Sequence, residues 1–341
     1  MSTVLEPYWN TNYGYCHSHR QHFDYLGQAD IGHKLAFINE GLLKLNCGDI
    51  AGNADLIHRC RKETNRLPVL ALDTNPHDVT EYLNQLYQYI DPGEFFVFGP
   101  DARTELFADP NLAAWPSFLC NQQLVQNFQL NYPKKYRISY LSGTLRYHRL
   151  KLFKDIKPWV QHNDIVVINC FTNQNFYNTI EDTPVNIDEY IADLPWQSIP
   201  GLIDSDQNAM HASDHQTNCH PAYAACVNIT GETASPFKDQ VFVTEKTWKA
   251  YVSGCLVINF GVKDLPSTLS NFGIEIWSEY DGCDHIDDKI CSIVDLFQRD
   301  DIFELYRQKQ EMVKYNQNLV CSKQFVKNLA MPAIEKLKDM I

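Results

Sequence analysis

The stretch from residue 67 to residue 99 constrains the fold most, because it alternates between strand and helix patterns. LPVLALD (67–73) is a short apolar run that predicts a buried strand. Apolar residues then recur at helical spacing up to Ile90, and EFFVFG (94–99) predicts a second strand after a DPG turn. A strand–helix–strand order favours a parallel sheet, so we predict an α/β fold.

Further segments of the same two kinds follow NYPKK, which reads as a linker near residue 131. The predicted strands are YRISYL (136–141), DIVVINC (164–170), AYAACVNIT (222–230), CLVINFG (255–261) and GIEIW (273–277). The predicted helices are HKLAFINEGLLKL (33–45), a helix that follows SGT (142–144) and stops at Pro158, FVTEKTWKAYVSG (242–254, closed by Gly254), DLPSTLSNFG (264–273) and most of 284–338.

This order predicts two stacked Rossmann-like domains that face a central cleft. The expected boundaries are 1–133 for the first domain and 134–320 for the second. A C-terminal helix (321–341) has room to cross back to the first domain. Ligands in such sheets bind beyond the carboxyl ends of the strands, which would face the cleft.

Composition narrows the class of protein. The formal charge of −13 argues against a dominant nucleic-acid-binding surface. No apolar run approaches the length that spans a bilayer, and the first twenty residues lack the pattern of a signal peptide, so we expect a cytoplasmic protein. The 11 cysteines include no CxxC pair, which favours reduced and mostly buried thiols.

The charges are unevenly distributed along the chain. Lys134 to Lys157 contains eight Lys or Arg residues and one acid, Asp155. The next stretch, 158–237, has ten acids and no Lys or Arg. A cationic segment inside an acidic protein indicates a local phosphate site, and a solvated charge run is the alternative.

The strongest single feature is VFVTEKTWKAYVSGCLVINFG (241–261), a predicted loop, helix and strand. Thr244 is the expected N-cap, and the helix N-terminus with Lys246 beside it would attract a phosphate. Glu245 can accept both hydroxyls of a ribose, and the ring of Phe242 can stack on a base. The alternative is an ordinary helix start whose Glu is favoured by the helix dipole.

The second feature is SYLSGTLRYHRLKLFKDI (139–156), where a strand leads through a small-residue loop into a basic helix. Arg146 and Arg149 lie one turn apart, and an arginine can hold a phosphate through two parallel hydrogen bonds. The chain contains neither GxGxxG nor GxxxxGK[ST], so a dinucleotide fold or a P-loop is not supported. A solvated cationic helix face is the alternative.

At these residues the chain resembles a known family. TEKTWKAYVSGCLVINFG is similar to the donor-site element of GT-B glycosyltransferases, closest to the α-1,3-fucosyltransferase type. CVNITGET, FGIEIWSEYDGCDHIDD and LSGTLRYHRLKLFKDI resemble segments of uncharacterised glycosyltransferase-like proteins of bacteria and their phages. The resemblance covers roughly residues 136–300.

The resemblance implies a sugar transfer from a nucleotide-diphosphate sugar to an acceptor hydroxyl, for glycan or glycoconjugate synthesis. Glu245 would bind the ribose, Lys246 and Arg146 the diphosphate, and Phe242 the base. The whole candidate donor-binding set is Arg146, Arg149, Phe242, Thr244, Glu245 and Lys246. No cofactor or metal is expected, because the cations replace Mg²⁺ at the departing diphosphate.

The family resemblance also implies inversion at the sugar, with a carboxylate of the first domain as general base on the acceptor. Asp73, at a predicted strand end, and Asp24 and Asp30, in the polar N-terminal region, are the candidates. A helix cap or a surface charge is the alternative for each of them.

Three other functions stay open at this point. One is a phage-type glycosyltransferase acting on hydroxylated bases in DNA, which the negative charge disfavours. A second is a nucleotide-sugar-binding protein without catalysis. A third is zinc-dependent hydrolysis through CHSHRQH (16–22) or NAMHASDHQTNCHP (208–221), although neither has a strong zinc-site spacing, and a solvated loop is the alternative.

Overall fold

The computed structural model describes residues 19–39, 49–72, 79–99, 109–116, 119–120, 133–142, 147–159, 162, 164–169, 221–231, 241, 243–261, 264–281 and 285–341. The chain divides into two compact units. The first unit contains residues 1–124 and 323–341, and the second contains residues 125–322. Each unit has a four-stranded parallel sheet with helices, so the predicted α/β class with two parallel-sheet domains is confirmed.

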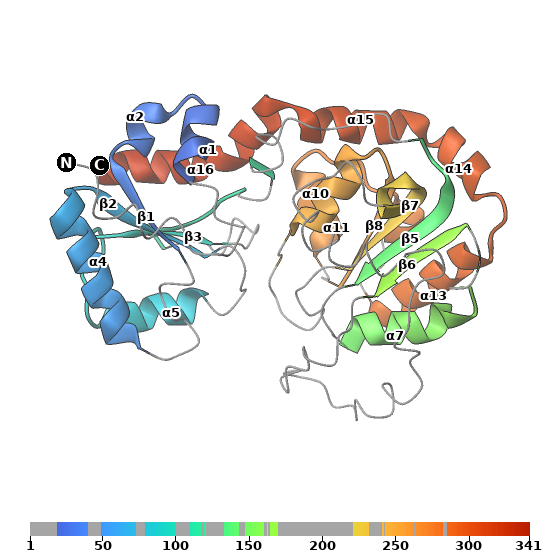
Figure 1. Cartoon of the computed structure of the whole chain (residues 1–341), viewed down its shortest axis with the longest axis horizontal. Helices are drawn as coiled ribbons and strands as arrows, with labels where there is room; N and C mark the ends of the chain where they lie inside the picture. The colour runs from blue at the N-terminus through green and yellow to red at the C-terminus, as the bar shows by residue number, and fades with distance from the viewer. Residues whose placement is uncertain are drawn as a thin grey trace. The chain divides into compact units, whose positions relative to one another are not determined.

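The first unit is built on a sheet whose strands follow one another in chain order. These strands are β1 (Leu35–Asn39), β2 (Leu67–Ala71), β3 (Phe96–Gly99) and β4 (Leu112–Ala114). Figure 1 labels the strands β1, β2 and β3 of this sheet. Helix α4 (Ile50–Thr64) connects β1 to β2, and α5 (Val79–Leu86) lies between β2 and β3. The predicted strands at 67–73 and 94–99 and the helix between them are therefore confirmed.

Apolar side chains cover both faces of this sheet. On one face, Ile57 of α4 and Leu83 of α5 pack in a core cluster with Leu70 and Val97. On the other face, the ring of Trp115 stacks on Phe98 and on Phe23 of α1 (His19–Tyr25), with ring centroids 4.5 and 4.8 Å apart. The sheet is thus the central layer of its unit.

The last helix, α16 (Lys323–Met340), belongs to the first unit. The Lys336 ammonium donates to the backbone carbonyls of Asp109 and Leu112, each at 2.8 Å, where β4 begins. The expected return of the C-terminal helix to the first domain is confirmed.

The second unit has the strand order β6-β5-β7-β8. Its strands are β5 (Tyr136–Ser142), β6 (Ile165–Asn169), β7 (Ala225–Gly231) and β8 (Leu256–Phe260), all parallel. Ile138 of β5 pairs with Ile165 on one side and with Val227 on the other. The strand order therefore reverses at β5, which is the topological switch point of this sheet.

Helices pack around the second sheet. Phe153 of α7 (Tyr147–Ile156) and Phe297 of α13 (Ile286–Gln298) share a core cluster with β5, β7 and β8. α10 (Glu245–Val252) contacts β7, β8 and α15 (Gln310–Cys321).

The remaining elements of the two units are α2 (Ala29–Gly32), α11 (Leu265–Asn271), α12 (Ser278–Asp281), α14 (Ile302–Gln308) and two 3₁₀ turns at Lys157–Trp159 and Pro221–Ala224. Among the described residues, no helix is long and apolar enough to cross a membrane.

The prediction of a helix over 33–45 was wrong where the structure describes it, because Leu35–Asn39 is strand β1. Leu35, Ala36 and Ile38 are all buried. A continuous apolar run of this length fits a strand buried on both faces as well as a helix, and periodicity alone does not distinguish the two.

The predicted strand GIEIW (273–277) was also wrong, because this segment has no strand partner. The side-chain amide of Asn316 on α15 takes the place of one. It donates to the backbone carbonyl of Glu275 and accepts from the backbone N–H of Glu275, both at 2.8 Å. The backbone groups are thus satisfied without a sheet.

Candidate functional site

The two sequence features singled out above meet at one edge of the second sheet. β5 leads into α7, and β7 leads into α10, so both helices follow the carboxyl ends of adjacent strands. The guanidinium of Arg149 donates to the backbone carbonyl of Gly231, the last residue of β7, at 2.6 Å. The ring of His148 lies 5.5 Å from that of Phe260, at the end of β8. This edge, at the switch point, is where α/β sheets bind ligands.

The start of α10 has the local structure that the sequence predicted. Thr244 is the N-cap, with extended backbone, and its hydroxyl accepts from the backbone N–H of Lys246 at 3.3 Å. The helix ends before Gly254, whose φ of +66° lies in the left-handed region. The first-turn N–H groups of a helix point along its axis and, with the helix dipole, attract an anion. Lys246, half-buried, adds a cation to this turn.

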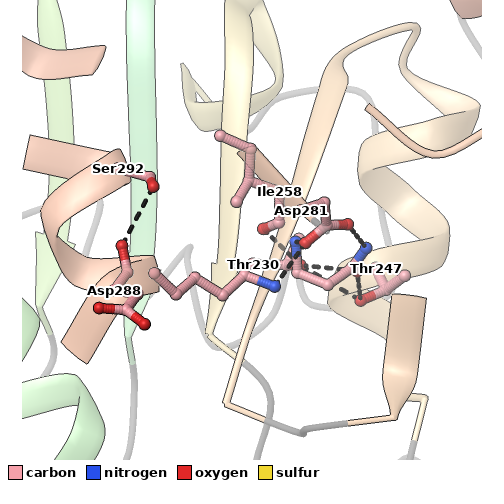
Figure 2. Close-up of polar contacts among 8 residues, drawn as sticks. Thr230, Thr247, Ile258, Asp281, Asp288 and Ser292 are labelled. Atoms are coloured by element: carbon pink, nitrogen blue, oxygen red, sulfur yellow. Dashed lines mark hydrogen bonds and ion pairs between the residues drawn. The ribbon is translucent and has the colours of Figure 1, made fainter. Parts of the chain in front are cut away.

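A buried polar network connects this turn to the sheet (Figure 2). The hydroxyl of Thr247, in the first turn of α10, lies 3.3 Å from the Thr230 hydroxyl and 3.3 Å from Oδ1 of Asn259. Thr230 is on β7 and also hydrogen-bonds Asn259 and the carbonyl of Ile258. All three side chains are fully buried, so α10 is joined to β7 and β8 by hydrogen bonds inside the core.

The network continues from Asn259 to an ion pair. Nδ2 and the backbone N–H of Asn259 donate to the carboxylate of Asp281, at 2.7 and 3.0 Å. The ammonium of Lys289, on α13, donates to the same carboxylate at 2.6 Å. Burial, followed by the nearby Asp281 carboxylate, raises the pKa of Tyr251 on α10. At neutral pH Tyr251 is therefore an uncharged neighbour of this network.

Sequence reasoning missed this network. Its residues lie far apart in the chain, and only the fold brings them together. A signal was present, since Thr230 and Asn259 interrupt the apolar strand segments CVNIT and LVINF. A polar side chain inside a buried strand needs a hydrogen-bond partner, and here the partners are the helix turn and Asp281.

Several cations of the segment 134–157 make contacts within the protein. The Lys134 ammonium donates to the carbonyls of Tyr223 and Ser253 at 2.9 Å, at the opposite, amino-terminal edge of the sheet. Arg137 pairs with Asp164 at that edge.

Lys151, on α7, pairs with Asp287, and this hydrogen bond lowers the pKa of the Asp287 carboxyl. Lys134, Arg137 and Lys151 are thus engaged in contacts within the protein, and a phosphate site in this segment stays a prediction.

The structure places some of the predicted donor-site residues. Thr244 and Lys246 open α10, and Glu245 is its first residue, although the Glu245 side chain lies outside the described structure. Arg149 is 1% exposed and donates a hydrogen bond to the backbone carbonyl of Gly231, so it supports the structure at the edge of the site. Its binding of a phosphate stays a prediction. Arg146, Phe242 and Asp73 lie outside the described residues.

The other two candidates for a general base are in the first unit. Asp24, on α1, and Asp30, on α2, are both exposed. Asp30 precedes Leu35, the first residue of β1, and so lies at the amino-terminal side of that strand, away from the edge where parallel sheets bind ligands. The roles of Asp24 and Asp30 as general bases both stay predictions.

The histidine clusters give no metal site in the part of the chain that is described. His22 is a core residue on α1, and its Nδ1 accepts from the indole N–H of Trp115 at 3.1 Å. Among the described residues, no three His, Cys, Asp or Glu side chains gather as metal ligands would. The side chains of His17 and His19 and the whole second cluster, which holds His211, Asp214, His215, Cys219 and His220, lie outside that part.

Comparison with known proteins finds similarity to a solved structure. No protein-family model and no curated protein matches the chain. A solved structure of the DNA-modifying enzyme β-glucosyltransferase, in the presence and absence of its substrate uridine diphosphoglucose, matches with a TM-score of 0.41 and 11% identity. The match spans 89% of this chain and 99% of that one. A likeness at this TM-score carries no weight for the function.

Proposed function

We propose that the chain is a glycosyltransferase that moves a sugar from a nucleotide-diphosphate sugar to an acceptor hydroxyl. The observation that carries the proposal is the first turn of α10. A Thr-capped helix start with Lys246 beside it follows β7, the neighbour of the strand at which the order reverses. Helix N-termini at this place in an α/β sheet bind phosphate groups.

The proposed chemistry follows from the charges at this turn. Bond cleavage leaves a nucleoside diphosphate carrying additional negative charge. The N–H groups of α10 and the ammonium of Lys246 stabilise that charge as it develops, which lowers the barrier. Glu245 is proposed to hold the ribose, Phe242 the base and Arg146 the diphosphate.

The remaining parts of the proposal concern the acceptor. Transfer is proposed to invert the sugar, with a carboxylate of the first unit deprotonating the acceptor hydroxyl. A glycan or glycoconjugate is the proposed acceptor, because the charge of −13 opposes binding to a polyanion. No metal is required, since the cations of the site neutralise the diphosphate.

A thermal-shift screen tests the donor site directly. The purified chain is heated with GDP, UDP, ADP, CMP and dTDP, each with Mg²⁺ or with EDTA. A ligand that binds only the folded state stabilises it by about 2.7 kcal/mol when present at about a hundred times its dissociation constant. We expect one diphosphate to raise the melting temperature equally in both conditions.

The Lys246→Ala variant and a matched control make the screen specific to α10. Lys246→Ala should weaken diphosphate binding at least about tenfold, or about 1.4 kcal/mol. Lys151→Ala removes an equal charge from the same unit, where Lys151 pairs with Asp287 on the outside of α7 and α13, and should leave binding unchanged. Failure of all five nucleotides to bind, or equal losses in the two variants, would contradict the proposed donor site.

A further inference from the structure

A buried carboxylate lies behind the proposed phosphate-binding turn rather than in it. Asp281, the last residue of α12, is fully buried and accepts three hydrogen bonds. The donors are the Lys289 ammonium at 2.6 Å and the side-chain and backbone nitrogens of Asn259 at 2.7 and 3.0 Å. A buried ion pair adds little net stability, because desolvation of both charges offsets their attraction. Its presence here calls for another role.

The pair determines which way the Asn259 amide faces. An amide has a donor end and an acceptor end, and the hydrogen-bond network decides between the two orientations. Because the carboxylate accepts from Nδ2, Oδ1 of Asn259 faces the hydroxyls of Thr247 and Thr230, 3.3 Å from each. A neutral amide in place of Asp281 would no longer impose this orientation.

The Asn259 amide in turn holds the first turn of α10. Thr247 is the third residue of the helix, and its hydroxyl lies 3.3 Å from Oδ1 of Asn259 and 3.3 Å from the Thr230 hydroxyl. Side chains of both β7 and β8 therefore fix this turn against the sheet. The first-turn N–H groups of α10 are thereby aimed in one direction.

We propose that Asp281 is a positioning residue that, through Asn259 and Thr247, aims the N-terminus of α10 at the donor diphosphate. This inference rests on the proposed function. Lys289 has a complementary role, because it neutralises Asp281 and so prevents a buried negative charge from opposing the diphosphate. The pair thus fixes geometry without adding net charge behind the site.

Asp281→Asn tests this role, because it keeps the shape and removes the charge. Asp164→Asn is the control, since it breaks another ion pair of the same sheet, with Arg137, at the opposite edge. Two readouts are compared at a temperature at which all variants are folded by circular dichroism. One is the affinity for the nucleoside diphosphate that the unsubstituted chain binds, and the other is amide hydrogen exchange in peptides covering 244–252.

Asp281→Asn is expected to weaken diphosphate binding about tenfold, a loss of about 1.4 kcal/mol, and to speed exchange in 244–252. Asp164→Asn should lower the melting temperature without either effect. Equal changes in both variants would mean that Asp281 acts through general stability, and unchanged affinity and exchange in Asp281→Asn would also overturn the inference.

Thr247→Val keeps the ion pair intact and removes only the last link to α10, so it decides the question if Asp281→Asn does not fold. We expect the same two changes, smaller in size, and wild-type behaviour in both readouts would overturn the route through Thr247. If the unsubstituted chain binds no diphosphate, the proposed function fails by itself. The exchange measurement needs no nucleotide and still decides whether the network holds α10.

Discussion

Arg149 donates a hydrogen bond to the backbone carbonyl of Gly231, which joins the first turn of α7 to the last residue of β7. The guanidinium is buried, and the carbonyl it reaches lies at the point where the chain leaves β7 toward α10. One arginine of the basic segment therefore holds the edge of the candidate site together.

Arg149→Met should destabilise the fold by about 2 kcal/mol, because it removes a charged hydrogen bond to a buried carbonyl while keeping an apolar stem of similar length. Urea unfolding measures this loss. Diphosphate affinity, measured where the variant is folded, should fall less than in Lys246→Ala. A variant of normal stability that has lost diphosphate binding would show instead that Arg149 contacts the ligand.

Thr244→Ala should cost about 1 kcal/mol of folding free energy, the usual effect of losing an N-cap hydroxyl. Thr244→Ser keeps the oxygen that accepts from the Lys246 N–H and should keep most of that stability. Chemical denaturation of the three proteins gives the comparison. Equal losses in both variants would show that the methyl group of Thr244, rather than its hydroxyl, is what matters.

Gly254→Ala should cost more than about 1 kcal/mol, because its φ of +66° is unfavourable for any residue with a Cβ. The new Cβ would also lie 3.2 Å from Nε2 of Gln317, which donates to the carbonyl of Val252 at 2.7 Å. Gly27→Ala separates the two effects, since at φ +74° its Cβ would meet nothing within 4 Å. Thermal unfolding should rank Gly254→Ala as the more harmful change.

The free energy of unfolding should fall as the pH rises from about 9, partly because of Cys226. Burial raises the pKa of the Cys226 thiol from 9.0 to about 12. Between these values the folded state keeps a proton that the unfolded state has lost, so alkaline pH favours unfolding. Cys226→Ala should flatten this dependence in urea titrations, whereas alanine at the exposed Cys291 should not. Identical slopes in all three proteins would exclude Cys226 as a source.

The sequence predicted the elements whose patterns are local. The apolar runs at 67–73 and 255–261 are strands, and Thr244 caps the helix that it was expected to cap. The run around Leu35 was misassigned because a doubly buried strand has no alternation to reveal it. GIEIW failed for another reason, since a distant amide, Asn316, took the role of a neighbouring strand.

The candidate site was predictable only in part, because its support depends on contacts between distant segments. Charge density alone suggested a phosphate site between Lys134 and Lys157. The structure shows that Lys134 and Arg137 make contacts at the amino-terminal edge of the sheet, whereas Arg149 makes one at the carboxyl edge. Asp281 lies in a segment that was noted only for its resemblance to other proteins, and no role was predicted for Asp281 or Lys289. Nothing in the sequence next to Asp281 indicates that its carboxylate meets Asn259, which lies 22 positions earlier in the chain.

The place of α16 in the first unit has a consequence for how the protein is made. The second unit is one continuous stretch of chain and can fold on the ribosome as soon as it emerges. The first unit has to wait, because Lys336 meets Asp109 across 227 positions and Leu112 across 224. A nascent chain interrupted before α16 would carry a finished second unit and an incomplete first one, with apolar surface available to chaperones.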